Sequence, residues 1–330
     1  MSSQNHEIPV RESIRQLSHD SWVIGGRILL SRTKSSSGFP STSCTWSDGD
    51  GAYFSVSEYD NSNNEDLPGE PLPKGGPIEK VHDAGDASAV WSIGDAFLKV
   101  RALQTTTNHN TTREHITLDY LHNPTKFELN FPAPRALYHA EFGSRYYLIT
   151  SRIPGQTLET TWPQMTELEK QFCVDRVVNI CKDLVRYGGE SSAICGVDGK
   201  HLNENWMSPP GKDDRSPEAQ LAYCSEIGMV CSDLVLAHND MGPYNVIVNL
   251  ARMDNDSVGI IDWEMAGYVP RHWVRTKFRV CFAMDFDFPG DADERRSERV
   301  GWRRRVQQKL EQEDFPDVAE AYITRYNKSK

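Results

Sequence analysis

Three short runs of alternating hydrophobic and polar residues follow one another between residues 77 and 102. The runs are "PIEKVHD", "SAVWSIG" and "AFLKVRA", and the pairs Gly85-Asp86 and Gly94-Asp95 separate them. Alternation with a period of two is typical of strands, and Gly-Asp pairs favour tight turns. The sequence therefore predicts an antiparallel meander of three strands in this region.

A helix and a further strand are predicted to complete this region. The run "TREHITLDYLHN" carries apolar residues at helical spacing, with Thr111 or Thr112 at its start. The run "RYYLITSRI" returns to strand character before Pro154-Gly155 stops it. Antiparallel strands with one helix predict a small α+β lobe over residues 77–153.

Helical spacing dominates the chain after residue 153. The run "TELEKQFCVDRVVNICKDLVRYG" predicts a long helix, and "SPEAQLAYCSEIGMVCSDLVLAH" predicts a second helix that begins at Ser216-Pro217. The runs "VIV" and "VGII" predict a short hairpin, and residues 273–330 are mostly of helical pattern. A larger, mainly helical lobe is therefore predicted over residues 154–330.

The first 76 residues form a third region with two parts. The run "VRESIRQLSHDSWVIGGRILLS" places Ile14, Leu17 and Trp22 at helical spacing, which predicts an N-terminal helix. Residues 31–76 are rich in Ser, Gly, Asn, Asp and Pro. Such a stretch has little apolar surface to bury, so it predicts a flexible or loosely attached segment.

Composition narrows the possible partners. A chain of 330 residues exceeds the size at which one core stops growing, which favours two unequal lobes. The net charge of −11 repels a nucleic-acid backbone. No apolar stretch is long enough to cross a bilayer, and the polar start lacks the pattern of a secretory signal. We therefore expect a cytoplasmic protein that binds neither nucleic acid nor membrane.

The seven cysteines are scattered and contain no C-x-x-C pair. An odd number of cysteines without paired spacing favours reduced thiols over a disulfide framework or a zinc site.

One polar run, "AHNDMGPYNVIVNL", interrupts the aliphatic pattern at residues 237–250. It has the spacing H-x-D-x-x-x-x-N through His238, Asp240 and Asn245, and "GIIDW" brings Asp262 a short hairpin later. A metal that bridges two phosphates needs hard oxygen ligands from separate backbone segments, while a base must face the attacking hydroxyl. This spacing therefore predicts a site for phosphoryl transfer.

With "LAHNDMGPYNVIV" and "GIIDWEMAGYVP", the chain resembles the aminoglycoside phosphotransferase and choline kinase branch of the protein-kinase-like fold. The likeness is greatest to the fungal phosphotransferase enzyme family. Asn239 and "DWE" depart from the arginine and D-F-G of protein kinases. The segments "GDASAV", "FLKV", "TREHITLDYL" and "LITSRIPGQTL" follow one another in the family order, and the resemblance covers roughly residues 77–269. It implies a bilobal α+β fold with a small antiparallel-sheet lobe and a larger helical lobe.

The resemblance also implies a nucleotide site in the amino-terminal lobe. Lys99 would hold the α- and β-phosphates of ATP and would be braced by Glu114. Gly85 and Ser88 would line the turn above the phosphates, where backbone N–H groups approach oxygen closely. The backbone of residues 151–153 would hold adenine, with Ser151 at its start and Ile153 as an apolar wall.

In the carboxy-terminal lobe, the resemblance implies that Asp240 is the base. Asn245 and Asp262 would be the Mg²⁺ ligands, and His238 would prop the loop.

Several of these residues have simpler alternatives. Glu128 is an alternative partner for Lys99, and Glu264 is either a further carboxylate at the metal or a solvated residue. Gly85 and Ser88 could be no more than a hairpin turn and a polar strand start. Two acids of the tail, Asp285 and Asp287, either face a cationic acceptor or are ordinary exposed residues.

The predicted function is an ATP- and Mg²⁺-dependent transfer of the γ-phosphate to a hydroxyl of a small molecule. Acidic surroundings tolerate an amine-bearing acceptor such as an aminoglycoside or an amino alcohol. One alternative is a kinase-like binding or regulatory protein with little turnover. A third hypothesis is a protein kinase, which is disfavoured by "DWE" and by the lack of an A-P-E segment.

Overall fold

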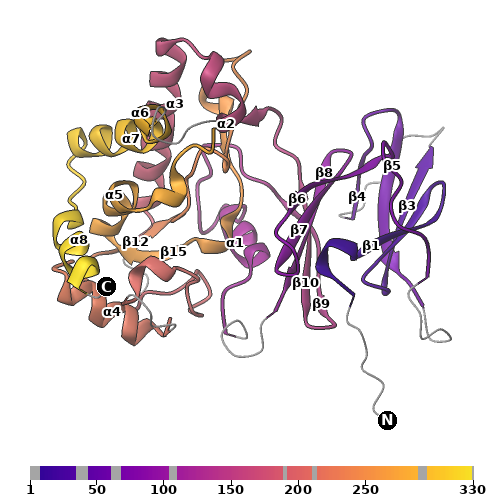
Figure 1. The fold of residues 1–330 in the computed structure, drawn as a ribbon, viewed down its shortest axis with the longest axis horizontal. Coiled ribbons are helices and arrows are strands. Elements are labelled where there is room, and N and C mark those ends of the chain that lie inside the picture. The colour runs from indigo at the N-terminus through magenta and orange to yellow at the C-terminus, as the bar shows by residue number, and fades with distance from the viewer. Residues whose placement is uncertain are drawn as a thin grey trace. The chain divides into compact units, whose positions relative to one another are not determined.

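The computed structural model describes residues 8–34, 44–60, 68–103, 110–188, 192–209, 214–288 and 296–328. The chain divides into two compact units (Figure 1). Unit 1 consists of residues 1–109 and 135–152, and unit 2 consists of residues 110–134 and 153–330. Unit 1 carries antiparallel sheets and unit 2 most of the helices, which confirms the α+β class.

The first sheet of unit 1 lies where a helix was predicted. After the 3-10 turn η1 (Val10–Glu12), its strands are β1 (Ile14–Ser18), β2 (Ser21–Ile24), β3 (Ile28–Lys34), β4 (Thr45–Ser47) and β5 (Ala52–Glu58). They pair antiparallel in the order β1-β2-β3-β5-β4. The prediction of an N-terminal helix is therefore wrong.

The physical reason is burial on the sheet. Trp22, Val23 and Ile24 are buried together, and Ile28 and Leu30 alternate with half-buried neighbours along β3. Tertiary packing has decided the structure of a segment whose local spacing also fits a helix. The segment predicted to be flexible contributes β4 and β5 to this sheet, and its residues 35–43 and 61–67 lie outside the described residues.

The second sheet of unit 1 contains the predicted meander. Its strands are β6 (Ile78–Asp83), β7 (Ser88–Ile93), β8 (Ala96–Ala102), β9 (Ala136–Phe142) and β10 (Arg145–Ser151). They run in the order β6-β7-β8-β10-β9, and all neighbours are antiparallel. The meander and the fourth predicted strand are confirmed, and β9 is an addition.

Both sheets of unit 1 contribute to one hydrophobic core. Trp22 and Phe54 come from the first sheet, and Trp91 and Leu98 come from the second. The indole of Trp46 in β4 donates to the carbonyl oxygen of Ile93 at 2.7 Å. The apolar face of the meander is thus covered by the amino-terminal sheet, which explains why that sheet is ordered.

Gly25 shows how closely the two sheets approach. It has a φ of +59°, and a Cβ placed there would lie 2.3 Å from the hydroxyl oxygen of Tyr147. Only glycine fits this conformation and this space.

Unit 2 contains the predicted helices with short strands between them. Its first elements are α1 (Glu114–Leu121), β11 (Gln156–Thr157), α2 (Leu158–Thr161), η2 (Trp162–Gln164), α3 (Glu167–Val185), η3 (Asn205–Met207) and α4 (Pro217–Glu226). The central elements are β12 (Leu234–Ala237), β13 (Val246–Val248), η4 (Asn255–Ser257), β14 (Val258–Ile260), η5 (Trp263–Met265) and β15 (Gly267–Pro270). The last are α5 (Arg271–Val280), η6 (Phe282–Met284), α6 (Arg296–Arg299), α7 (Gly301–Gln312) and α8 (Ala319–Lys328). Among the described residues, no helix has both the length and the apolar character needed to span a bilayer.

The boundaries of the helices follow local chemistry. Thr166 and Glu169 form a capping box that begins α3, and its buried face includes Val177 and Leu184. The helix predicted from Ser216 is shorter than expected, because α4 ends at Glu226 and Gly228 takes a φ of +89°. The end of that predicted helix is instead the buried strand β12.

Candidate active site

The polar loop of residues 238–245 connects two small sheets of unit 2. It leaves β12, which pairs with β15, and enters β13, which pairs with β14. Asp262 lies two residues beyond the end of β14. The amide of Ile261 donates to the carbonyl oxygen of Asn245 at 3.0 Å, so the segment before Asp262 lies beside the end of the loop. The predicted hairpin is confirmed, and it brings the two polar segments together.

His238 holds the loop against this hairpin. The amide of Asp240 donates to Nδ1 of His238 at 3.1 Å, so Nε2 carries the hydrogen and donates to the carbonyl oxygen of Ile261 at 3.0 Å. His238 is 1% exposed, and its ring forms a T-shaped pair with Trp263 whose ring centres are 4.6 Å apart. With both nitrogens engaged, His238 fixes the backbone of Asp240 and is poorly placed to carry a proton.

Asn239 is a second anchor of the loop. It has a φ of +65°, a conformation that asparagine tolerates better than most residues. Its side-chain amide donates to the carbonyl oxygen of Met265 at 2.9 Å. Protein kinases carry an arginine after the loop histidine, whereas the residue here turns inward and ties the loop to η5.

Asp240 and Asn245 are held together inside the loop. The amide nitrogen of Asn245 donates to the backbone oxygen of Asp240 at 2.9 Å and to its Oδ2 at 3.0 Å. Asn245 is 4% exposed. Because its nitrogen serves Asp240, its Oδ1 is the atom that suits a hard cation.

Tyr244 touches the other carboxylate oxygen. Its hydroxyl lies 3.2 Å from Oδ1 of Asp240 and 2.9 Å from the carbonyl oxygen of Ala283 in η6. A hydroxyl has one hydrogen, so it donates to one of these acceptors at a time. Tyr244 thus links the predicted base to the segment that follows α5.

The surroundings raise the pKa of Asp240 to about 6. Burial is the largest cause, because a carboxylate loses solvation there. The charge of Lys277 and the hydrogen bond from Tyr244 oppose the rise, whereas the charges of Asp262 and Glu204 add to it. The group is therefore mostly ionised at neutral pH and close to the range that suits a general base.

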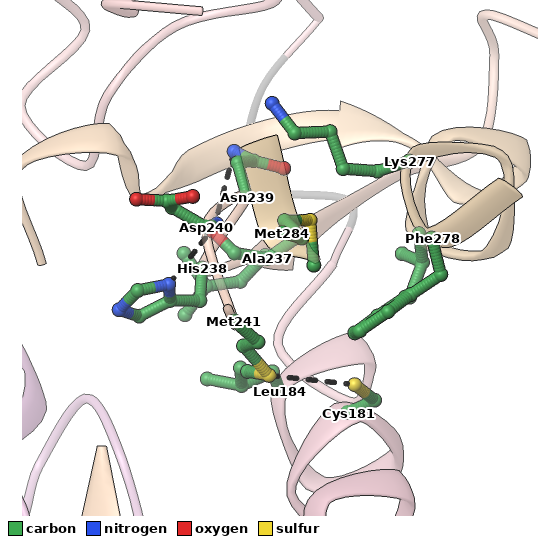
Figure 2. A pocket seen from close by; sticks show the side chains of 12 residues that line it. Cys181, Leu184, Ala237, His238, Asn239, Asp240, Met241, Lys277, Phe278 and Met284 are labelled. Carbon is green, nitrogen blue, oxygen red and sulfur yellow. Dashed lines mark hydrogen bonds between the residues drawn. The ribbon is translucent and has the colours of Figure 1, made fainter. Parts of the chain in front are cut away.

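Lys277 of α5 lies beside Asp240. Both residues line a cavity of about 20 Å³, together with His238, Asn239 and Met241 (Figure 2). This volume holds about one water molecule. The amine of Lys277 forms an ion pair of 2.5 Å with Oε2 of Glu204, and both side chains are buried.

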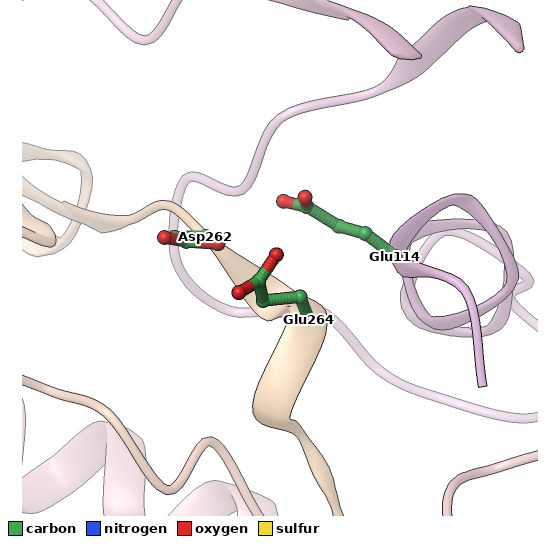
Figure 3. A group of neighbouring side chains, drawn as sticks. All are labelled: Glu114, Asp262 and Glu264. Carbon is green, nitrogen blue, oxygen red and sulfur yellow. The ribbon is translucent and has the colours of Figure 1, made fainter. Parts of the chain in front are cut away.

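Three carboxylates of unit 2 converge, and one of them belongs to the predicted metal ligand Asp262. Glu114 from α1, Asp262 and Glu264 each place an oxygen within 4.8 Å of the other two (Figure 3). The amide of Trp263 donates to Oε1 of Glu114 at 3.1 Å, which ties α1 to this turn. Asp262 adopts a left-handed conformation with φ and ψ of 64°. Hard oxygen atoms from two segments suit a divalent cation such as Mg²⁺, so the residues fit the predicted ion.

Lys99 lies on β8 in unit 1. Its neighbours Leu98 and Val100 are buried in the core of unit 1, so Lys99 extends from the opposite face of the sheet, where it is half-buried. Its pairing with Glu114, or with the alternative partner Glu128, stays a prediction.

The predicted phosphate turn is a tight β6–β7 connection. Gly85 has a φ of +67°, and its amide donates to Oδ1 of Asp83 at 3.0 Å. Ser88 is the first residue of β7 and lies opposite Arg101. The Asp83 carboxylate accepts the Gly85 amide hydrogen that a phosphate oxygen would otherwise accept. Phosphate binding at Gly85 therefore requires the hydrogen bond between Gly85 and Asp83 to break.

The predicted hinge lies at the end of β10. The amide of Ser151 donates to the carbonyl oxygen of Arg135, and the amide of Arg152 donates to that of Asp95. In unit 2, Ile153 packs near Gly259, where a Cβ on the glycine would meet its methyl group at 3.0 Å. The adenine contact predicted for residues 151–153 stays a prediction. The amides of Ser151 and Arg152 already donate within unit 1, so they are not available to adenine.

Sequence reasoning missed three residues around Asp240. Tyr244 lies within the H-x-D-x-x-x-x-N motif, directly before Asn245, so its position in the motif was the available signal. Lys277 and Glu204 are 73 positions apart, and neither belongs to a recognisable pattern. The two tail acids Asp285 and Asp287 pair with Arg303 and Arg299, which supports their reading as ordinary acids of the tail.

A model of the phosphotransferase enzyme family matches residues 83–273, which is more than half of the chain. The chain therefore belongs to this family, and the resemblance stated from its motifs is confirmed. The match begins after the amino-terminal sheet, so β1 to β5 lie outside it. A search of curated proteins finds no match.

Solved structures of aminoglycoside phosphotransferases are similar over most of their length. One is the enzyme APH(3″)-Id from Streptomyces rimosus, with 17% identity, a TM-score of 0.44, and coverage of 76% of this chain and 90% of that one. Another is the GDP complex of aminoglycoside 2′-phosphotransferase-IIIa, with 13% identity, a TM-score of 0.41, and coverage of 76% and 91%. The assignment to the family rests on the family model.

Proposed function

We propose that this protein transfers the γ-phosphate of ATP to a hydroxyl group of a small molecule. The observation that carries the proposal is the arrangement of Asp240, Asn245 and Asp262. Asp240 and Asn245 are hydrogen-bonded to each other. Asp262 comes after β14, which pairs with the strand β13 that begins just after Asn245. Phosphoryl transfer depends mainly on positioning and on neutralising charge, and this arrangement serves both.

Asp240 would accept the proton of the acceptor hydroxyl as that oxygen attacks phosphorus. Its pKa of about 6 keeps it ionised at neutral pH while leaving it basic enough to accept a proton. Asn245 fixes the rotamer of Asp240 through Oδ2. His238 fixes its backbone through the amide. The carboxylate is therefore oriented before the acceptor arrives, which lowers the cost of reaching the reactive geometry.

Mg²⁺, when bound, would neutralise the charge that develops between the β- and γ-phosphates. Asn245 through Oδ1 and Asp262 through its carboxylate would hold it. Glu264 lies close enough to Asp262 to add a ligand directly or through water. In the same proposal Lys99, braced by Glu114, holds the α- and β-phosphates, Gly85 and Ser88 cover them, and Ser151 and Ile153 flank adenine.

Transfer of labelled phosphate tests this function. Purified protein is incubated with γ-labelled ATP, Mg²⁺ and a broad mixture of hydroxylated metabolites, and the label is followed into new products. The proposal predicts labelled products that need both ATP and Mg²⁺. Nucleotide binding without hydrolysis or transfer would instead favour the binding or regulatory protein, and label in protein substrates alone would favour the protein kinase.

A further inference from the structure

We propose that Lys277, supported by Glu204, is a specificity-determining residue of the acceptor side, and that it selects neutral or anionic alcohols with a flat apolar group over acceptors that carry an ammonium beside the reacting hydroxyl. The inference rests on the proposed function. The proposal disfavours an amine beside the reacting hydroxyl, whereas the acidic composition tolerates an amine-bearing acceptor.

The first support is the position of the Lys277 charge. Lys277 lines the cavity beside Asp240, whereas its partner Glu204 does not (Figure 2). The ion pair therefore presents its positive end to the predicted base. A cation placed next to a hydroxyl at Asp240 would meet this ammonium at short range.

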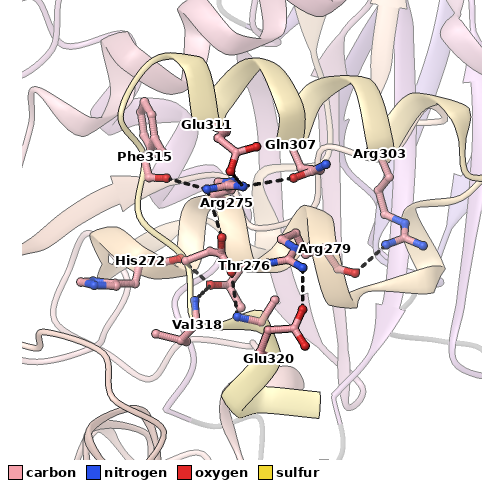
Figure 4. Close-up of polar contacts among 12 residues, drawn as sticks. His272, Arg275, Thr276, Arg279, Arg303, Gln307, Glu311, Phe315, Val318 and Glu320 are labelled. Carbon is pink, nitrogen blue, oxygen red and sulfur yellow. Dashed lines mark hydrogen bonds and ion pairs between the residues drawn. The ribbon is translucent and has the colours of Figure 1, made fainter. Parts of the chain in front are cut away.

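The second support is that Lys277 cannot easily move away. Its helix α5 is anchored to the segments that follow it (Figure 4). Arg275 pairs with Glu311 at 2.7 Å and with Asp317 at 3.1 Å. Arg279 pairs with the same Asp317 at 2.8 Å. With the helix fixed and Glu204 fully buried, the ammonium has a defined position rather than a choice of several.

Glu204 also connects Lys277 to an aromatic pair. Its Oε1 accepts the amide hydrogen of Trp206 at 2.9 Å, while Oε2 accepts from Lys277. The amine of Lys277 lies 5.8 Å from the centre of the Trp206 ring. The rings of Trp206 and Phe282 form a T-shaped pair with their centres 5.3 Å apart. Phe282 is 66% exposed.

The aromatic pair belongs to the surroundings of Asp240. Phe282 precedes Ala283, whose carbonyl oxygen lies 2.9 Å from the Tyr244 hydroxyl, and Met284 lines the cavity. The short helix η6 thus runs from the aromatic pair to the base. An exposed phenylalanine backed by a tryptophan offers a flat apolar surface to an acceptor that reaches Asp240.

A matched series of three acceptors tests the inference. Phenethyl alcohol, tropate and phenylglycinol share a hydroxymethyl group and a phenyl ring, and they carry a hydrogen, a carboxylate and an ammonium beside the hydroxyl. Binding to the complex with ADP and Mg²⁺ is measured by calorimetry, and transfer is measured with ATP. We expect phenylglycinol to bind and react at least about tenfold less well than the other two.

Variants of the pair distinguish charge from packing. In the double variant Lys277→Met with Glu204→Gln, the discrimination against phenylglycinol should disappear. The paired substitution Lys182→Met with Glu313→Gln is the matched control, because it removes another Lys–Glu ion pair of 2.5 Å in unit 2. Neither residue lines the cavity, so this control should keep the wild-type ratio of acceptors. Ratios within one preparation are independent of the fraction that is folded. If the double variant does not fold, the ranking by the wild-type protein still decides.

Each outcome bears on the inference. Equal or tighter binding of phenylglycinol by the wild type, or a ratio unchanged in the double variant, would overturn it and leave the proposed function standing. Failure of all three compounds to bind would overturn it as well. A wild-type protein that neither hydrolyses ATP nor transfers phosphate to any acceptor would remove the proposed function itself.

Discussion

The side-chain amide of Asn245 donates to the carboxylate of Asp240 at 3.0 Å, so the predicted base and the predicted metal ligand are one hydrogen-bonded unit. Asn245→Asp would replace this donor with a second negative charge. The like charges would repel each other and disturb both roles, so we expect kcat to fall by about a hundredfold or more. Steady-state kinetics measures the effect.

Asn249→Asp is the control for that substitution. Asn249 lies just beyond β13 and accepts the amide hydrogen of Ala251 through its side chain. It adds the same charge outside the loop, and kcat should stay near that of the wild type. Equal losses in the two variants would show that added charge alone, rather than the bond to Asp240, lowers activity.

The pKa of Asp240 predicts the acid side of the pH profile. A base must be deprotonated, so kcat/KM should fall about tenfold per pH unit below its pKa of about 6 and level off above it. Lys277 lowers this pKa, so Lys277→Met should move the acid limb to higher pH. A profile without an acid limb between pH 5 and 7 would argue against Asp240 as the base.

Tyr244→Phe should separate binding from chemistry. The hydroxyl links Asp240 to η6 through Ala283, and its loss removes the one donor that these two acceptors share. Since η6 borders the acceptor side, we expect KM for the acceptor to rise severalfold, with a smaller effect on kcat. A loss confined to kcat would instead place the Tyr244 hydroxyl in the chemical step.

The carboxylates of Glu114, Asp262 and Glu264 predict a response to metal. Like charges at this spacing destabilise the free protein, and a bound cation relieves their repulsion. Addition of Mg²⁺ should therefore raise the Tm in differential scanning fluorimetry. Glu264→Gln should raise the Tm without metal and reduce the gain on adding it.

Glu218→Gln provides the comparison, because Glu218 is an exposed residue in the first turn of α4. Its response to Mg²⁺ should match that of the wild type. A response to Mg²⁺ that is the same in the Glu264 variant would exclude Glu264 from the metal site.

The fold was predictable where local patterns and tertiary packing agree. The meander of β6 to β8 and the capped helix α3 follow directly from alternation, turn residues and capping. The amino-terminal sheet was not predictable, because the spacing of Ile14 and Trp22 also fits a helix, and burial against the second sheet decided between the two. The strand β12 was missed because its four residues directly continue a helical pattern.

The site was predictable to the extent that one loop contains it. His238, Asp240 and Asn245 are close in sequence, and the structure brings them together as hydrogen-bonded neighbours. Lys277 lines the cavity beside Asp240, and its partner Glu204 comes from a distant segment, so only packing shows that Lys277 and Glu204 meet. The chemistry of the acceptor side therefore depends on tertiary contacts that no short motif records.

Asp240→Ala tests the central claim most directly, with phosphoryl transfer and ATP affinity measured on the same preparation. The account predicts that transfer falls to background while the dissociation constant for ATP with Mg²⁺ stays within about threefold of the wild type, because Asp240 serves the acceptor rather than the nucleotide. A variant that still transfers phosphate at a rate comparable to the wild type would contradict the assignment of Asp240 as the base.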